Sequence, residues 1–482
     1  SYYEIKNNTE FQQCIHDHQT LYHMIYDMVW EKIISFIQEL RVKKELYICF
    51  DGIPPIAKMY QQKQRRYKSY IEKNIMKHHT QSIKIHSNSN VIVSEFDTNH
   101  ITPGTVFMNS LDKFIQEKVE DFNKSNNSVS IHFSPTSQTG EGEHKICNYI
   151  RTLASTQGLN FKEKNCVIYG LDADLIMLGL LLLQVHKQVF LFKETRHFSY
   201  IEHIKEENNY YFSMMKLGIE ITRLMQQSNY IQGIMDYCFI GLLCGNDFMP
   251  HTPSINIRNS GINLLISSYK YVLHKETSKN YSLIDIESKN IKWSSFYILI
   301  EYMSRIEIDK INENLNWKLK MKTKVRVKDF ADKLNFLPIY DNSMEIELLN
   351  NFNRDKYNEM ILHANKEKVE QLCKNYFQVL EWNWKYYNGD MRMCNVVYKC
   401  CHGPLLVDMV KYIPIFEDSY TFLEPKKYID DTKLHHLSLL YYVMPQSQYE
   451  KYNCRHSNHA QVIRTNFLQN IYAMEFCKFT YF

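Results

Sequence analysis

Six carboxylates in four short motifs, spread over residues 51–247, constrain the fold of this chain most strongly. They are Asp51, Glu141, Glu143, Asp172, Asp174 and Asp247. Each motif carries glycine or follows an apolar run, which is not the setting of ordinary surface charge. Neighbouring carboxylates repel one another when ionised unless a divalent cation neutralises them. The pattern therefore predicts a fold that gathers these acids around Mg²⁺ or Mn²⁺, ions that prefer hard oxygen ligands.

Length and composition predict a globular protein with a large core. The chain has 482 residues, of which 44% are hydrophobic and 23% charged, enough for one large domain or two to three ordinary ones. A net charge of only +4 excludes a general coat of positive charge, so any nucleic-acid site must be a local patch. Twelve cysteines without zinc-type spacing, no long apolar run and no signal-peptide pattern favour an intracellular protein with free thiols.

Alternation of strands and helices predicts an α/β fold with a mainly parallel central sheet flanked by helices. Residues 45–50 (ELYICF) and 166–169 (CVIY) read as buried strands, and residues 21–40 show helical spacing of apolar residues. Ligands of such sheets gather outside the carboxyl ends of the strands. Asp51 and Asp172 follow the two strands and are expected there.

Two of the acidic motifs are expected at helix ends. Glu141 and Glu143 precede a helical run at 144–153, where the helix dipole favours negative charge, so a simple capping pair is the alternative. Asp247 follows an apolar helix at 230–243 that ends at Gly245 and Asn246, and a plain turn is its alternative. The four motifs together favour a metal site over either alternative.

A basic helix face is predicted directly after Asp51. If the segment from Ile56 is helical, four residues at i, i+4, i+7 and i+8 share one face. They are Lys58, Gln62, Arg65 and Arg66. Three cations and an amide would satisfy a terminal phosphate through charge-assisted hydrogen bonds. A solvated basic face is the alternative, and the nearness of Asp51 favours the phosphate pocket.

Residues 317–328 alternate lysine or arginine with largely apolar residues, which predicts a strand with one basic face. The lysines would either protect an exposed sheet edge against aggregation or contact phosphates.

At these motifs the sequence resembles the Xrn-type 5'-3' exoribonuclease family. The stretches that carry the resemblance are DGIPPIAKMYQQKQRR (51–66), ITPGT (101–105), GEGEHKICNYIR (140–151), YGLDADLIMLGL (169–180), GNDFMPHTPSINIR (245–258), YFQVLEWNWKYY (376–387) and SLLYYVMPQSQYEKY (438–452). The resemblance spans most of the chain except the lysine-rich middle, and its specificity comes from the ordered succession of motifs.

The resemblance implies roles for the residues that match. The six acids would hold one or two Mg²⁺ or Mn²⁺ ions, and the basic face from Lys58 to Arg66 would bind a 5'-monophosphate. Trp382 would stack on the leading bases, whereas Trp317 and Trp384 have no such match, and Trp384 is expected in the core or the groove wall. The fold implied is a PIN/FEN-like nuclease core with a largely helical C-terminal segment packed on it.

Departures from the family pattern add further expectations. The family's first metal-binding Asp and a base-stacking His are expected upstream of Ser1, and the groove wall at 391–404 differs. A long C-terminal extension and a Cys/His knuckle are not found. We expect a compact core: a nuclease region at 1–305, a variable lysine-rich connection at 306–354, and a second region at 355–482 that completes the groove.

The resemblance implies a metal-dependent, processive 5'-3' exoribonuclease. Its partner would be single-stranded RNA with a 5'-monophosphate, degraded to 5'-mononucleotides, with no membrane and a cytoplasmic rather than nuclear location. Two alternatives remain open: a 5' DNA flap nuclease of the same fold, and an inactive RNA-binding relative.

Overall fold

The chain forms two compact units, each of which is built from separate stretches of sequence. Unit 1 comprises Ser1–Pro54, Gln62–Ile146 and Asp431–Ile463, and unit 2 comprises Pro55–Gln61, Cys147–Asp430 and Arg464–Phe482. The structure, a computed structural model, describes residues 18–84, 98–170, 172–193, 210–275, 281–324, 352–392, 394–415, 420–425, 428 and 436–445.

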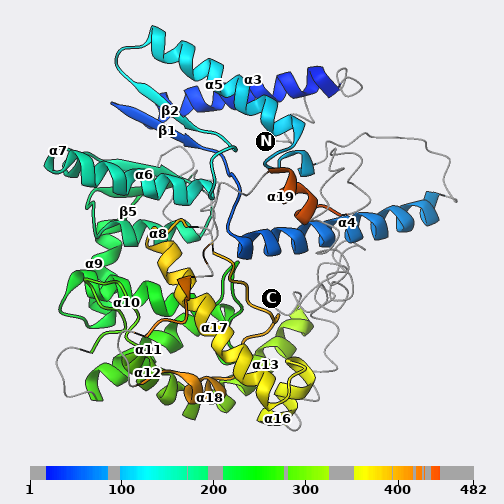
Figure 1. Cartoon of the computed structure of the whole chain (residues 1–482), viewed down its shortest axis with the longest axis vertical. Helices are drawn as coiled ribbons and strands as arrows, with labels where there is room; N and C mark the ends of the chain where they lie inside the picture. The colour runs from blue at the N-terminus through cyan, green and yellow to red at the C-terminus, as the bar shows by residue number, and fades with distance from the viewer. Residues whose placement is uncertain are drawn as a thin grey trace. The chain divides into compact units, whose positions relative to one another are not determined.

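Unit 1 contains a two-stranded parallel sheet of β1 (Glu45–Cys49) and β2 (Ser130–Ser134), with Glu45 opposite Ser130. Helices α3 (His18–Glu39) and α5 (Val106–Ser125) pack beside it (Figure 1). They bury an apolar core because their hydrophobic residues recur at helical spacing. The Thr105 hydroxyl caps α5 by accepting a hydrogen bond from the Met108 amide at 3.2 Å.

Three further helices complete the described part of unit 1. They are η1 (Thr98–His100), most of α4 (Ile56–Lys84) and α19 (His436–Val443). The boundary between the units falls within α4 and again within α6 (Gly142–Gln157).

The sheet of unit 2 has the order β3 (Cys166–Tyr169), β4 (Val189–Lys193) and β5 (Tyr210–Ser213). β3 and β4 are parallel, whereas β4 and β5 are antiparallel. The remaining described elements of this unit are helical. They are α7 (Leu159–Lys162), α8 (Asp174–Leu182), α9 (Met214–Met225), α10 (Tyr230–Leu242), η3 (Ile257–Asn259), α11 (Gly261–Lys275), α12 (Trp293–Arg305), α13 (Glu307–Lys324), α16 (Arg354–Lys356), the π-helix η4 (Tyr357–Ile361), α17 (Lys366–Tyr387), α18 (Leu406–Met409) and η5 (Val410–Tyr412).

A buried carboxylate fixes the position of α10. The Asp236 side chain has no exposed surface; it accepts a hydrogen bond from the Tyr269 hydroxyl at 2.6 Å and from the backbone amides of Leu283 and Ile284 at 3.1 Å. Burial raises the pKa of Asp236 to about 7, so its charge depends on these donors. They tie the helix that precedes Asp247 to its neighbours.

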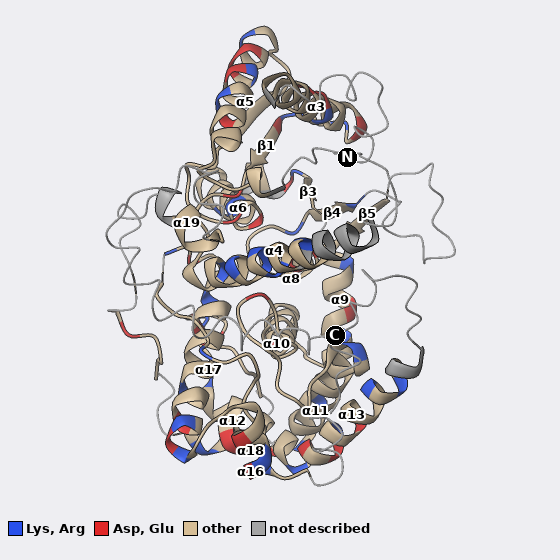
Figure 2. Cartoon of the chain, turned by 90° about the vertical axis from the view of Figure 1, so that its right-hand side faces the viewer, with Lys and Arg blue, Asp and Glu red and all other residues tan. Residues whose placement is uncertain are grey.

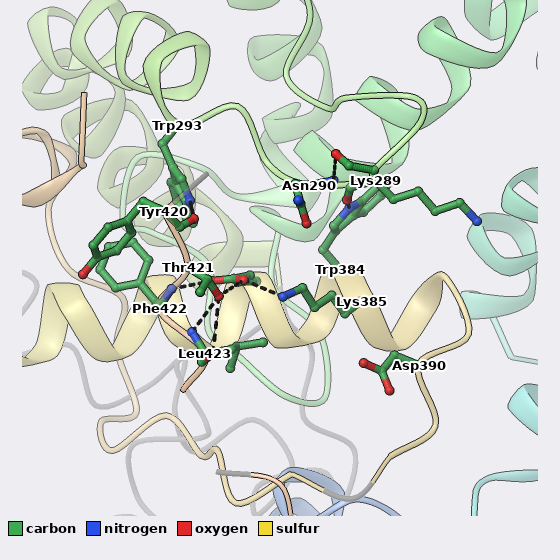
Figure 3. A network of polar contacts seen from close by, with 12 residues as sticks. Lys289, Asn290, Trp293, Trp384, Lys385, Asp390, Tyr420, Thr421, Phe422 and Leu423 are labelled. Carbon is green, nitrogen blue, oxygen red and sulfur yellow. Dashed lines mark hydrogen bonds and ion pairs between the residues drawn. The ribbon is translucent and has the colours of Figure 1, made fainter. Parts of the chain in front are cut away.

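A second buried carboxylate, Glu381, ties Thr421 and Phe422, both labelled in Figure 3, to α17. It accepts hydrogen bonds from the Thr421 hydroxyl at 2.6 Å, the Phe422 amide at 2.8 Å and the Lys385 ammonium at 2.7 Å. On the same helix, the Trp384 indole is buried and donates to the Lys289 carbonyl at 2.8 Å, which confirms the expectation of a core residue.

The structure confirms the α/β class and the parallel strand pairs. The strands expected at 45–50 and 166–169 are β1 and β3, and the helices expected around 21–40, 144–153 and 230–243 are α3, α6 and α10. The described strands form two small sheets rather than one central sheet. The nine described cysteines are free thiols. Within the described ranges, no helix combines the length and apolar character needed to cross a membrane.

The strand expected at 317–328 is wrong over its described part, because α13 continues to Lys324. Acids in its first turn, Glu307 and Asp309, favour the helix N-terminus, and lysine and leucine are good helix formers. Residues 325–328 lie outside the described residues. The proposed boundaries at 305 and 354 remain a prediction.

Candidate active site

Asp51 lies just beyond the carboxyl end of β1, where its side chain meets the start of α6. Its Oδ1 accepts a hydrogen bond from the Gly142 amide at 2.6 Å, although the two residues are 91 positions apart. Glu143 lies in the first turn of α6 and Glu141 immediately before it, and the Glu141 side chain is buried. The positive end of the helix dipole favours negative charge at this place. The predicted location of these three acids at a strand end and a helix start is confirmed.

Glycines allow the two loops of this site to approach closely. The Gly52 amide donates to the Gly140 carbonyl at 2.9 Å, and the Gly140 amide donates to the Ile53 carbonyl at 2.8 Å. A Cβ added at Gly52 would lie 1.7 Å from the Gln138 carbonyl oxygen. Gly140 has φ +104°, which L-residues rarely adopt. The backbone itself therefore places Asp51 against α6.

The buried Lys145 side chain places a cation among the backbone carbonyls near Asp51. Its ammonium donates to the Phe50 carbonyl at 2.9 Å and to the Pro135 carbonyl at 3.1 Å. Burial lowers the pKa of Lys145, while the charges of nearby acids, Asp51 included, act in the opposite direction. Lys145 was not among the predicted site residues, although it stands in the GEGEHK motif.

In unit 2, three other acids come close enough to influence one another. Asp174 begins α8, Asp172 stands two residues before it, and Asp247 follows α10. Burial raises the pKa of Asp174, and the negative charges of Asp172 and Asp247 raise it further. The Tyr387 hydroxyl, which hydrogen-bonds to Asp174, and the positive charge of Lys58 lower it. The charges of Asp172 and Asp247 thus act on Asp174, and we call these three residues the acid group of unit 2.

The position of Tyr387 is itself fixed by α6. The Arg151 guanidinium donates to the Tyr387 carbonyl at 2.9 Å, and Arg151 also lies against Gly389, whose φ of +100° lets the chain turn after α17. Tyr387 is buried. The end of α17 therefore holds a hydroxyl donor for Asp174, a role that the spacing of the sequence did not indicate.

Both carboxylate oxygens of Asp247 accept hydrogen bonds from the first turns of α4. The Lys58 ammonium lies 2.6 Å from Oδ2, and the Gln61 amide donates to Oδ1 at 3.0 Å. Lys58 was expected in a phosphate pocket, and Gln61 was not among the predicted residues. Position i+3 from Lys58 lies on the same helix face, so that spacing could have indicated Gln61.

The rest of the predicted basic face lies in the part of α4 that belongs to unit 1. Lysine and arginine residues recur along this helix (Figure 2). Arg65 is exposed, Gln62 is half-buried, and the Arg66 guanidinium donates to the Asn99 side chain at 3.0 Å. The expectation of a helix from Ile56 is confirmed, whereas a phosphate-binding role for this face remains a prediction.

Trp382, the expected base-stacking residue, is buried in unit 2 with only 2% of its surface exposed. One face of its ring stacks on Tyr386, with centroids 5.3 Å apart and an interplanar angle of 15°. Phe248, the residue after Asp247, meets it edge-on at 5.1 Å. The Lys58 ammonium lies 5.9 Å from the Phe248 ring centroid. Trp382 thus contacts Phe248, the residue next to Asp247. A base could reach the Trp382 ring only if the residues that cover it moved.

Within the described ranges, no three histidine, cysteine or acidic side chains converge as the ligands of a bound metal would. The donor chemistry of Asp172, Asp174 and Asp247 nevertheless fits a hard divalent cation, because all three offer carboxylate oxygens. The Lys58 ammonium neutralises the charge of Asp247, and its positive charge also favours the ionised form of Asp174. A divalent ion would meet the same electrostatic need.

Two stretches of the chain match known protein families. Residues 2–194 match the XRN 5'-3' exonuclease N-terminus, and residues 228–335 match the Xrn1 helical domain. The 5'-3' exoribonuclease 1 of Saccharomyces cerevisiae is 32% identical over 328 residues, which cover 62% of this chain and 20% of the relative.

Two other relatives give similar values. The 5'-3' exoribonuclease 1 of Homo sapiens is 30% identical over 339 residues, which cover 63% of this chain and 19% of the relative. The 5'-3' exoribonuclease 2 of Kluyveromyces lactis is 30% identical over 295 residues, which cover 53% and 29%. The matched region spans less than a third of each of these three relatives.

Proposed function

Because the chain belongs to the XRN family of 5'-3' exonucleases, we propose that it hydrolyses single-stranded RNA from its 5' end. The substrate is a 5'-monophosphorylated strand, and the products are 5'-mononucleotides released in succession without dissociation of the RNA. The proposal includes a PIN/FEN-like nuclease core and a cytoplasmic location.

The observation that supports this proposal most directly is the contact between Lys58 and Asp247. The first cation of the basic helix face lies 2.6 Å from one of the acids. A residue that can bind a phosphate is therefore adjacent to a residue that can act on the next phosphodiester bond. This adjacency brings a candidate phosphate ligand next to a candidate catalytic acid.

In this proposal the basic face of α4 recognises the 5' end. Lys58, Gln62, Arg65 and Arg66 form charge-assisted hydrogen bonds to the terminal phosphate, and the arginines can bind it in a bidentate manner. A pocket of the size of a monophosphate rejects capped and triphosphate ends by steric exclusion and unpaired charge.

The six acids supply the catalytic part of the site. Asp51, Glu141 and Glu143 are held by the start of α6, and Asp172, Asp174 and Asp247 form the group in unit 2. One or two bound Mg²⁺ or Mn²⁺ ions would lower the pKa of a water and stabilise charge on the attacking and leaving oxygens. The joint action of both acid groups is inferred from the sequence motifs.

Trp382 is proposed to stack on a base once its ring is uncovered. Tyr386 already occupies one face, so the base would use the opposite face. Stacking of this kind contributes about 1–3 kcal/mol per base and tolerates any sequence, as a degradative enzyme requires.

A three-substrate assay tests the function. The protein is incubated with Mg²⁺ and matched RNAs that carry a 5'-monophosphate or a 5'-triphosphate, and with a flapped DNA. We expect mononucleotides from the monophosphate RNA only, and no release by Asp172→Ala.

Release from the DNA flap alone would favour a structure-specific DNA nuclease. Binding of RNA without release would favour an inactive relative. Equal activity of Asp172→Ala and wild type would show that the acid group is not catalytic.

A further inference from the structure

We propose that the ion pair between Lys58 and Asp247 couples metal binding to recognition of the 5'-phosphate, so that the protein binds a 5' end tightly only when its acids carry metal. This inference deepens the proposed function and rests on the assignment of Lys58 to the phosphate pocket and of Asp247 to the metal site. It concerns the regulation of that site by its own residues.

The geometry holds Lys58 firmly on the acid. Its ammonium is 2.6 Å from Asp247 Oδ2, and its side chain is only 13% exposed, against 35% for Asp247. The ring of Phe248 lies beside the ammonium at 5.9 Å. Partial burial strengthens an ion pair because water screens it less. Lys58 in this position is therefore directed to the acid group.

Metal binding and the ion pair compete for the same oxygen. A divalent cation on Asp247 would repel the ammonium and replace it as the neutralising charge, as like charges at such short distances repel strongly. Gln61 does not compete, because its amide is neutral and donates to the other oxygen, Oδ1, at 3.0 Å. Metal binding would thus release Lys58 while Gln61 keeps Asp247 oriented.

A terminal phosphate offers the released ammonium an anion. Conversely, a phosphate that draws Lys58 away from Asp247 leaves that carboxylate free for metal. Such coupling between two ligands is reciprocal, and it typically changes each affinity by about 5- to 150-fold. The consequence is that the metal-free protein does not hold RNA 5' ends unproductively.

The experiment measures RNA binding rather than cleavage. Fluorescence anisotropy gives the Kd of short phosphorothioate RNAs that end in a 5'-phosphate or a 5'-hydroxyl, in Mg²⁺ or in EDTA. The ratio of the two Kd values isolates recognition of the terminal phosphate. For the wild type we expect Mg²⁺ to raise this ratio by about 5- to 150-fold relative to EDTA.

Two variants test the role of the ion pair from both sides. Lys58→Met should remove the effect of Mg²⁺ on the ratio. Asp247→Asn frees Lys58 and should raise the ratio in EDTA. Lys73→Met removes the same charge from the exposed part of α4 and should keep the Mg²⁺ effect.

Two results would overturn the proposal. One is a Lys58→Met variant that retains the effect of Mg²⁺ on the ratio. This would occur if the variant weakened recognition of the 5'-phosphate equally with and without Mg²⁺, or if the metal contacted the phosphate directly. The other is an Asp247→Asn variant with an unchanged ratio in EDTA. Circular dichroism confirms that the variants are folded. If the protein cleaves RNA but Mg²⁺ does not change the ratio, the coupling is rejected and the proposed function stands. If Mg²⁺ changes the ratio but RNA is not cleaved, the proposed function is rejected and the coupling stands.

Discussion

Asp51 and Asp247 both accept a hydrogen bond at 2.6 Å, but from donors of different kinds. The donor to Asp51 is the backbone amide of Gly142, which cannot move without α6. The donor to Asp247 is the ammonium of Lys58, which ends a flexible side chain and carries a full charge. The same distance therefore describes a fixed contact in unit 1 and an exchangeable contact in unit 2.

This difference indicates how each acid group is prepared for its ligand. In unit 1, glycine loops and the N-terminal end of α6 orient the carboxylates before anything binds. In unit 2, side chains of α4 and α17 neutralise and orient them, and these can be replaced one at a time. Substitutions should accordingly act through backbone geometry in unit 1 and through single interactions in unit 2.

Among the substitutions that test this comparison, Gly142→Ala is expected to have the largest effect. The new Cβ would lie 3.2 Å from Asp51 Oδ1 and 3.2 Å from the Cys49 carbonyl, so Asp51 or α6 must shift. The shift needed is a few tenths of an ångström. Displacement of a catalytic group by about 1 Å can cost about 100-fold in rate, so we expect a loss in mononucleotide release of at most about 100-fold. Gly241→Ala is the control, because its Cβ makes only ordinary contacts, the nearest at 3.6 Å. Equal activity of the two variants would contradict the fixed contact.

A paired substitution of neighbouring glutamines should separate the two roles proposed for α4. Gln61→Met removes a donor to Asp247, and loss of such an orienting group typically costs about 10- to 100-fold in metal affinity or activity. Gln62→Met should instead reduce the preference for a 5'-phosphate over a 5'-hydroxyl. Calorimetric Mg²⁺ titration and competition between the two RNAs measure the effects. Identical behaviour of both variants would contradict the separate roles.

Tyr387→Phe should lower stability in a pH-dependent manner. The pKa of Asp174 is raised in the folded protein, so ionised Asp174 opposes folding, and the Tyr387 hydroxyl reduces this cost by lowering that pKa. Without the hydroxyl the pKa of Asp174 rises further, so the loss of folding stability should be greatest at pH values where Asp174 is ionised. A hydrogen bond to a charged group contributes about 1.5–3 kcal/mol, against about 0.5–1.5 kcal/mol for a neutral one.

Urea unfolding in EDTA at about pH 4 and about pH 8 checks this sign, since an ordinary aspartate titrates near the lower value. The difference between variant and wild type should be larger at the higher pH. A loss that is larger at the lower pH would mean that the hydroxyl supports the neutral form of Asp174. Tyr211→Phe, at an exposed position of β5, is the control.

The smallest effect is expected from Arg65→Ala, because Arg65 is exposed. An exposed ionic contact contributes about 0.2–1 kcal/mol, or up to about fivefold in affinity. This loss should reduce the preference for a 5'-phosphate and leave the rate of the chemical step nearly unchanged in single-turnover kinetics. Lys73→Ala, another exposed position of α4, serves as the control. A similar loss on 5'-hydroxyl RNA would contradict the assignment of Arg65 to the pocket.

The sequence alone predicted the elements that carry the acids. Strong local signals explain this success: apolar runs end before Asp51 and Asp172, and a helix begins at Gly142, just before Glu143. The period-two pattern at 317–324 led to a wrong prediction, because alternation indicates a strand only when one face is buried. In α13, Trp317 and Leu319 are half-buried like Lys318, and helix-favouring residues decide the structure.

The partners of the acids could not be predicted with the same success. Helical spacing selects a face of α4 but does not say which of Gln61 and Gln62 reaches an acid. That depends on where the turn after α10 places Asp247, and α10 itself is held by buried contacts such as those of Asp236. Tyr387 is a still more distant partner, since the end of α17 lies 213 residues (387 − 174) from Asp174 in the sequence.

The parallel pairing of β1 with β2 has a consequence for synthesis of the chain on the ribosome. β1 can acquire its partner only after Ser130–Ser134 have been made, and Asp51 meets Gly142 across 91 residues. Contacts so far apart in sequence form late, and chains emerge from the N-terminus at about 5–20 residues per second. At that rate the nascent protein spends several seconds without the contact that holds Asp51 against α6.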